Sequence, residues 1–286
     1  MKNQNSPILF FFFGYCLFLL VGISCVKSVS TGLIRDAYIG SAFSFRINDV
    51  IALACPDLEI DEAIELQELV QKHPQLNRII HRYLCTYADW LDGDGEAFKN
   101  VNNEKAFKKL NHDILAETKR RNTRASLAIS DEEFLTQLMQ EEANVEFILE
   151  NRVPQNLQNF GKPAIVAIKV YSAVTSLWVQ ILLLLIMALL ISPLFAAYSR
   201  RFCRVLGIIF LVQGCFWAVV IPVIIKVADW RLLHFVDRIL GRSMFLEVTP
   251  FLWRGGMLLG IGSLLCIFQS RFFIKSVKMD KQNQAK

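Results

Sequence analysis

The chain has 286 residues, of which 53% are hydrophobic, 12% aromatic and 20% charged, and its mean hydropathy is +0.37. These values exceed the apolar share of ordinary soluble domains and argue against a soluble globular protein. Residues 27–165 hold 16 Lys and Arg against 22 Asp and Glu (net −6), whereas the remainder holds 15 against 4 (net +11). The basic remainder suits an anionic membrane face, and no nucleic acid partner is predicted.

The first apolar run extends from Ile8 to Val26, close to the ~20 residues that a helix needs to cross ~30 Å of hydrocarbon. Residues 1–26 are therefore predicted to form a cytoplasmic N-terminus and a first transmembrane helix that serves as a signal anchor. Two alternatives stay open. Lys2 ahead of an apolar core is also typical of a cleaved signal peptide, and a lipoprotein signal would end at Cys25. The length of the run favours the anchor.

Residues 27–165 form a polar interval long enough to bury a core of its own. Its apolar residues recur at helical rather than alternating spacing. The clearest helix runs from Leu76 to Leu91, with Pro74 ahead of it, where a first turn tolerates proline. Weaker helical patterns occupy residues 36–54, 58–72 and 103–121. The interval is therefore predicted to be a compact bundle of four or five helices.

A second clear helix begins at a capping box formed by Ser130 and Glu133. Its apolar positions continue to Leu149. Pro154 is predicted to end this helix, because proline lacks the N–H that the helical hydrogen-bond ladder needs. No strand-like alternation competes with these patterns.

Two cysteines, Cys55 and Cys85, lie within the polar interval. A disulfide between them would close a loop of about 30 residues and contribute about 3 kcal/mol. Two buried free thiols are an equally supported alternative.

His81 and Cys85 share a helical face but lack a second ligand pair, so no zinc site is predicted. The segment from Asp92 to Glu96 lacks the later glycine and glutamate of a calcium loop, and a turn is predicted there instead.

Three further apolar stretches follow, with basic links between and after them. The predicted elements are a second transmembrane helix at 166–199, a cytoplasmic loop at 200–204, a third helix at 205–225, an external loop with an interfacial amphipathic helix at 226–250, a fourth helix at 251–270 and a cytoplasmic tail at 271–286. The last apolar stretch is short, so Arg254 and Arg271 are expected to extend toward the two interfaces. The predicted fold class is all-α, a polytopic membrane protein with four transmembrane helices and a helical-bundle extracytoplasmic domain between the first and second.

Basic residues in short loops mark the cytoplasmic side. The link at 200–204 carries three arginines and no acid, and the tail after residue 270 carries five basic residues against Asp280 alone. Both termini are therefore predicted to be cytoplasmic, with residues 27–165 outside the plasma membrane. Residues 226–254 weaken this pattern, since five basic and three acidic residues would then be external. The external interval has no Asn-x-Ser/Thr site, which favours a bacterium.

One pair of residues suggests catalysis. His234 and Asp237 lie three positions apart in the amphipathic stretch 229–240, where an oriented base at the membrane interface is conceivable chemistry. A surface histidine beside an ion pair is the commoner explanation, and no nucleophile accompanies the pair. No cofactor-binding motif occurs, and none is predicted.

Four residues within the spans suggest helix packing. Gln180 and Gln213 are expected to form interhelical hydrogen bonds, and Gly256 and Gly260 are expected to permit close helix approach. These residues would serve packing within this chain and association with a partner equally well.

The preferred function is non-enzymatic: a helical ectodomain that binds a membrane or extracytoplasmic protein partner, or senses a ligand, while the spans anchor it in the lipid bilayer. The layout of one span, an external domain and three more spans is similar to that of some ABC-type export permeases and cell-division membrane proteins. A permease-like subunit of an export system is therefore the first alternative. A membrane-interface enzyme acting on lipid or acyl groups is the second.

Overall fold

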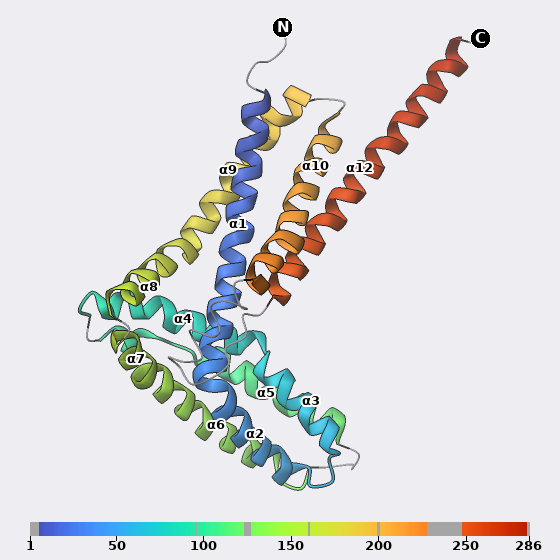
Figure 1. Cartoon of the computed structure of the whole chain (residues 1–286). Coiled ribbons are helices and arrows are strands. Elements are labelled where there is room, and N and C mark those ends of the chain that lie inside the picture. Colours follow the sequence, from blue (N-terminus) through green and yellow to red (C-terminus); the bar gives the residue numbers. More distant parts are fainter. Residues whose placement is uncertain are drawn as a thin grey trace. The chain divides into compact units, whose positions relative to one another are not determined.

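Helices account for every regular element in the described part of this computed structural model, residues 6–94, 96–122, 127–159, 161–198, 201–227 and 248–284 (Figure 1). No strand occurs in those ranges, which confirms the predicted all-α class. The described residues include four helical segments that are long and apolar enough to cross a membrane: Pro7–Ile39, Leu177–Tyr198, Phe202–Val227 and Thr249–Gln269. This finding supports a membrane location.

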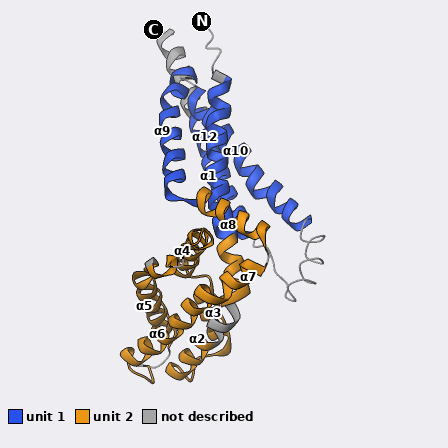
Figure 2. Cartoon of the chain, turned by 90° about the vertical axis from the view of Figure 1, so that its left-hand side faces the viewer, with its two compact units in different colours: residues 1–29, 175–286 blue, residues 30–174 orange. Residues whose placement is uncertain are grey.

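Two compact units divide the chain (Figure 2). Unit 1 combines Met1–Val29 with Thr175–Lys286, and unit 2 is Ser30–Val174. The first boundary falls inside helix α1 (Ser6–Ile34), which continues without interruption through the π-helix η1 (Arg35–Ile39) into α2 (Gly40–Ala54).

Unit 2 consists of short amphipathic helices joined by turns. After α2 come α3 (Ile60–Gln71), α4 (Pro74–Leu91), the 3₁₀-helix η2 (Ala97–Asn100), α5 (Glu104–Arg121), α6 (Asp131–Phe147), the π-helix η3 (Ile148–Arg152), α7 (Val153–Asn159) and α8 (Lys162–Thr175). The three weaker sequence patterns thus correspond to helices that begin and end within a few residues of the prediction.

Helix α4 supplies the longest buried stripe of unit 2, as its sequence pattern predicted. Pro74 occupies the first turn, and the preceding His73 caps the helix, because its Nδ1 accepts a hydrogen bond from the Gln75 N–H at 3.3 Å. The face that packs into the core contains Leu76, Ile79, Ile80, Tyr83, Leu84 and Tyr87, all buried. Burial of such side chains contributes about 1.5–3 kcal/mol each, so this stripe stabilises the bundle.

Helix α6 begins as predicted, but the predicted end at Pro154 is wrong. Ser130 Oγ accepts a hydrogen bond from the Glu133 N–H at 3.2 Å and so caps the first turn. The chain then stays helical through η3 to Asn159. Pro154 is tolerated because it falls in the first turn of α7, directly after the π-helix, where its missing N–H costs little. The helix ends before Gly161, whose φ of +70° favours glycine.

Unit 1 packs long apolar helices around aromatic side chains. Besides α1 it contains α9 (Leu177–Tyr198), α10 (Phe202–Cys215), the π-helix η5 (Phe216–Val220) and α12 (Thr249–Gln284). Within this unit α1 and α10 run in one direction and α9 and α12 in the other (Figure 1). Trp217 stacks on Phe18 and on Phe251, with ring centroids 5.0 and 6.1 Å apart. Helix α12 continues into the basic tail beyond its predicted end at residue 270.

The predicted helix at 166–199 is two helices rather than one. Helix α8 ends at Thr175 and α9 begins at Leu177, with Ser176 between them. Ser176 Oγ accepts a hydrogen bond from the Val179 N–H at 3.4 Å, and the Gln180 side-chain amide donates to the Thr175 carbonyl at 2.9 Å. In this structure Gln180 thus bonds a carbonyl at the helix break, where unpaired backbone groups need partners, rather than a neighbouring span.

Two polar side chains connect α1 to the other helices of unit 1. Gln213 on α10 donates from Nε2 to the Gly14 carbonyl at 3.2 Å, an interhelical bond of the expected kind. Arg254 on α12 reaches across to α1. It donates to the hydroxyls of Ser24 and Ser28, at 2.9 and 2.7 Å.

Glycines bring the backbones of α10 and α12 together. Gly207 and Gly214 on α10, seven residues apart, lie opposite Gly262 and Gly255 on α12. A Cβ added to Gly214 would stand 2.9 Å from the Gly255 carbonyl oxygen, and one added to Gly207 would stand 2.9 Å from that of Gly262. Such distances leave no room for a side chain, so the antiparallel pair packs backbone against backbone.

The glycines singled out in the sequence, Gly256 and Gly260, lie elsewhere. A Cβ on either would meet no atom within 4 Å in the described structure. The contact between α10 and α12 uses Gly255 instead, one position earlier, and repeats every seven residues rather than every four. Gly256 and Gly260 therefore do not serve packing against α10, and association with a partner stays a prediction.

We expect Gly255→Ala and Gly256→Ala to change stability in opposite directions. Alanine favours a helix interior by about 1 kcal/mol over glycine, and at Gly256 nothing opposes this gain. At Gly255 the new methyl would stand 2.5 Å from the Ala218 backbone nitrogen, and such overpacking costs about 1–3 kcal/mol. Thermal unfolding of the two variants in detergent provides the measurement. If Gly255→Ala and Gly256→Ala shift the melting temperature equally, the close contact of α10 with α12 at Gly255 is contradicted.

Candidate functional site

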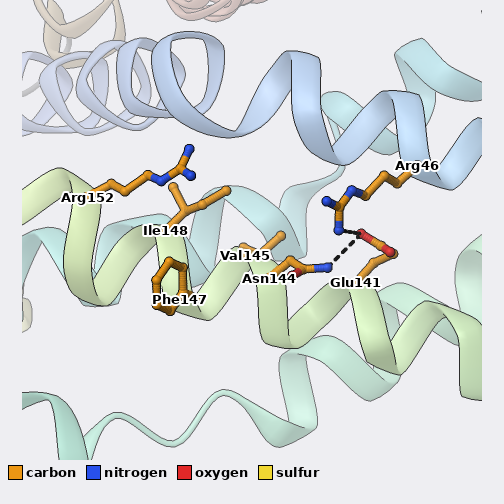
Figure 3. Close-up of a pocket in the computed structure, with 7 residues that line it drawn as sticks. All are labelled: Arg46, Glu141, Asn144, Val145, Phe147, Ile148 and Arg152. Carbon is orange, nitrogen blue, oxygen red and sulfur yellow. Dashed lines mark hydrogen bonds and ion pairs between the residues drawn. The ribbon is translucent and has the colours of Figure 1, made fainter.

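The candidate site is an amphiphilic pocket of about 220 Å³ in unit 2, between α2 and the segment formed by α6 and η3 (Figure 3). It combines basic, acidic, amide and apolar groups, and we call it the two-arginine pocket. The lining residues are Arg46, Glu141, Asn144, Val145, Phe147, Ile148 and Arg152. This volume suits one side chain or a small anion rather than a drug-sized ligand, since typical ligand pockets are about 300–1,000 Å³.

Helical spacing aligns one wall of this pocket. Glu141, Val145, Ile148 and Arg152 follow one another at steps of four, three and four residues, which places them along one face. Figure 3 shows Ile148 and Arg152 directed toward α2, while Arg46 extends from α2 toward Glu141. The wall includes η3, and π-helical turns are frequent at functional sites.

The pocket carries a positive charge in excess. Arg46 Nη1 lies 3.5 Å from Glu141 Oε2, and the Asn144 amide donates to the same oxygen at 3.1 Å. No acidic side chain in the described residues pairs with Arg152, which is exposed. Because the carboxylate of Glu141 balances only one of the two guanidinium groups, an incoming anion is attracted. The side chain of Phe147, 57% exposed, offers apolar contact at the rim.

A second pocket, of about 500 Å³, lies along α4 and η2 and contains the predicted His81 and Cys85. Cys85 Sγ lies 3.9 Å from His81 Nδ1 and 4.0 Å from Nε2. Both distances are near the upper limit for a hydrogen bond to sulfur, so the contact between the two side chains is weak. His81 Nδ1 instead lies 2.7 Å from the Tyr171 hydroxyl. No cluster of metal-binding side chains occurs in the described part of the chain.

The two cysteines of the predicted pair are not joined. Cys55 is buried at the C-terminal cap of α2, whereas Cys85 lies in α4, and no disulfide connects them in the described structure. Burial raises the pKa of the Cys55 thiol, which keeps it protonated and unreactive.

The segment from Asp92 to Glu96 forms a turn, as predicted. Asp94 Oδ1 accepts a hydrogen bond from the Glu96 N–H at 3.0 Å.

The predicted catalytic pair, His234 and Asp237, lies outside the described residues. Its geometry is therefore not part of the site described here.

Half-buried carboxyl groups follow the same helical segment as the pocket. Glu142, Glu146 and Glu150 recur every four residues, so they share a face. Burial raises the pKa of Glu142 to about 7, and burial together with the charge of Glu150 raises the pKa of Glu146. The Asn111 amide donates to Glu142, and the Tyr83 hydroxyl donates to Glu150 at 3.0 Å. Unit 2 therefore contains a carboxyl that ionises near neutral pH.

Comparison with known proteins gave no match to any family model, curated protein or solved structure. The candidate site consequently rests on the geometry of this chain alone.

Sequence reasoning missed the two arginines of the pocket. Arg46 and Arg152 lie far apart in the chain, and each resembles an ordinary solvated cation of an amphipathic helix. The sequence offered one local signal for Arg152. It lies three residues after Leu149, where the helical spacing of apolar residues becomes irregular. Only the packing of α2 against α6 brings the arginines to one pocket.

We expect Glu142→Gln to stabilise unit 2 at alkaline but not at acidic pH. The folded-state pKa of about 7 is raised, so the contribution of the protonated carboxyl is complete below about pH 4.5 and is lost as the pH rises through 7. The isosteric amide should therefore raise the free energy of unfolding by about 1–2 kcal/mol at pH 8, after allowance for solvent screening. At pH 5 it should change little.

The measurement is urea unfolding of the full chain in detergent, followed by circular dichroism at both pH values. Glu68→Gln is the control, because Glu68 is exposed on α3 and pairs with Lys72. If Glu142→Gln and Glu68→Gln give the same pH profile, the burial of Glu142 is not responsible.

Proposed function

We propose that this chain is a non-enzymatic, multi-pass protein of the bacterial plasma membrane whose helical ectodomain binds a partner protein through the two-arginine pocket. In this proposal unit 2 is external, both termini are cytoplasmic, and the spans serve as anchor and assembly surface. The observation that carries the proposal is that Arg152, beside the exposed side chain of Phe147, has no acidic partner among the described residues.

The orientation is supported by the distribution of basic residues. The short link 200–204 and the tail after residue 270 are strongly basic, whereas residues 27–165 carry a net −6 (16 basic against 22 acidic side chains). Positively charged short loops stay in the cytoplasm. An acidic segment between the first two spans is accordingly external in the proposal.

The chemistry of the pocket suggests the kind of partner. Arginine and aromatic side chains are the commonest centres of binding energy in protein interfaces. A guanidinium forms a bidentate pair with a carboxylate, and the apolar wall at Val145 and Ile148 accommodates a neighbouring aliphatic group. The pocket therefore favours a segment in which an acidic side chain, or a C-terminal carboxylate, stands next to an apolar one.

The two alternatives have weaker support. An enzyme needs an activated nucleophile or base, and the His81 nitrogen nearest to Cys85 lies closer to the Tyr171 hydroxyl, at 2.7 Å, than to the sulfur, at 3.9 Å. A permease-like subunit agrees with the order of spans and external domain, but a shared layout does not fix function. In the described residues, no contact between side chains specifically supports the enzyme or the permease-like subunit.

Partner binding can be tested by photo-crosslinking in intact cells. A benzophenone amino acid in place of Phe147 should form a discrete protein adduct, identified by mass spectrometry. Arg152→Glu should lower the yield about tenfold or more, since reversing an interfacial charge replaces attraction with repulsion. Lys108→Glu, an equal charge change on an exposed position of α5, should leave the yield unchanged. Equal yields in the two variants would refute the role of the pocket.

Topology is tested separately by reporter fusions. We expect a reporter after Arg121 to be active only outside the cytoplasm, and reporters after Arg201 and Lys286 to be active only inside, because basic short loops are retained. A cytoplasmic signal at Arg121 would invert the orientation.

A further inference from the structure

Arg254 is a charged residue within a candidate membrane span, Thr249–Gln269. Ionisable groups in such segments are costly to bury and commonly mark functional sites. Its guanidinium donates from Nε to Ser24 Oγ at 2.9 Å, from Nη2 to Ser28 Oγ at 2.7 Å and from Nη1 to the Pro250 carbonyl at 3.2 Å. It also forms a side-chain hydrogen bond with Cys25. The α1 hydroxyls therefore hold the guanidinium in place without neutralising it.

The guanidinium keeps its positive charge. No carboxylate in the described part of the chain forms an ion pair with Arg254, whose hydrogen-bond partners are two hydroxyls, a backbone carbonyl and the Cys25 thiol. Arginine pairs well with phosphate oxygens. A cation without a charged partner of its own attracts an anion.

A pocket of about 410 Å³ adjoins this guanidinium within unit 1. Its lining combines the hydroxyls of Ser28 and Thr249 with apolar groups: Ser28, Thr249, Pro250, Trp253, Arg254 and Met257. The side chains of Trp253 and Met257 are 71% and 52% exposed. In a membrane span, exposed apolar side chains contact lipid, and tryptophan prefers the level of the headgroups.

Both helices place the pocket at a membrane boundary. Arg254 lies five residues into α12, which is about 7.5 Å along the helix from Thr249. Ser28 lies 21 residues after Pro7, the start of the first candidate span, which is about 32 Å along α1 and close to the full thickness of the hydrocarbon. If the fourth span begins at Thr249, the guanidinium lies about one and a half helical turns from the membrane boundary, which is near the lipid phosphates.

We propose that Arg254, with Ser28 and Thr249 beside it, forms a binding site for the phosphate group of an anionic membrane lipid, whose acyl chains lie along Trp253 and Met257. A lipid with net negative charge is preferred to a zwitterionic one because Arg254 has no acidic partner in the ranges that the structure describes. The proposal requires the membrane location and does not depend on partner binding by unit 2.

The test uses the full chain in nanodiscs of phosphatidylcholine, with or without added phosphatidylglycerol, and the melting temperature as a function of lipid content. Phosphatidylglycerol should stabilise the parent protein, and its apparent affinity should fall about tenfold in Arg254→Gln. Lys226→Gln removes an exposed cation near the end of the third candidate span and should keep the parent affinity. Met257→Trp fills the pocket but leaves Arg254 intact, and should also weaken binding.

Each outcome decides the proposal. Equal stabilisation of parent, Arg254→Gln and Lys226→Gln would show a general charge effect and overturn the site. If Arg254→Gln fails to fold, Met257→Trp decides, and unchanged affinity in that variant overturns the site. A third arm adds inorganic phosphate to phosphatidylcholine nanodiscs. Stabilisation there, without any from phosphatidylglycerol, would assign the site to a soluble phosphate compound and overturn the lipid assignment.

Discussion

Hydrocarbon offers no hydrogen-bond partner to a peptide group, and this constraint applies to every candidate span of unit 1. Directly before the span Leu177–Tyr198, at the break between α8 and α9, Ser176 and Gln180 form hydrogen bonds with backbone groups. Gln213 donates to a carbonyl of α1. Without a hydrophobic force between spans, close backbone approach becomes the main attraction, and the glycines of α10 and α12 provide it.

The periodicity of apolar residues was sufficient to predict the class, the helices of unit 2 and the stretches apolar enough to cross a membrane. It failed at local exceptions to helical geometry. Pro154 did not end its helix because a π-turn precedes it, and the break at Ser176 is invisible to hydropathy because both flanks are apolar. The contact face of α12 could not be read from the spacing of Gly256 and Gly260, since the partner helix selects which glycine it meets.

The two proposed sites bind anions by different physical means. In the two-arginine pocket, Arg152 is exposed and its charge is screened by water, so specificity must come from the apolar wall and the shape of the cavity. At Arg254 the surroundings are less polar and the guanidinium is fixed by hydroxyls before any ligand arrives. Preorganisation of this kind lowers the entropic cost of binding. The sequence did not single out Arg152, and it indicated Arg254 only as a cation near an interface, because long-range packing creates both environments.

The carboxyl of Glu142 means that unit 2 does not exist in a single charge state under ordinary conditions. Its pKa is raised to about 7, so its protonated and ionised forms coexist around neutrality, and acidification favours the neutral form. Samples prepared in different buffers are therefore different mixtures, and the acidity of the surroundings becomes part of the molecular composition.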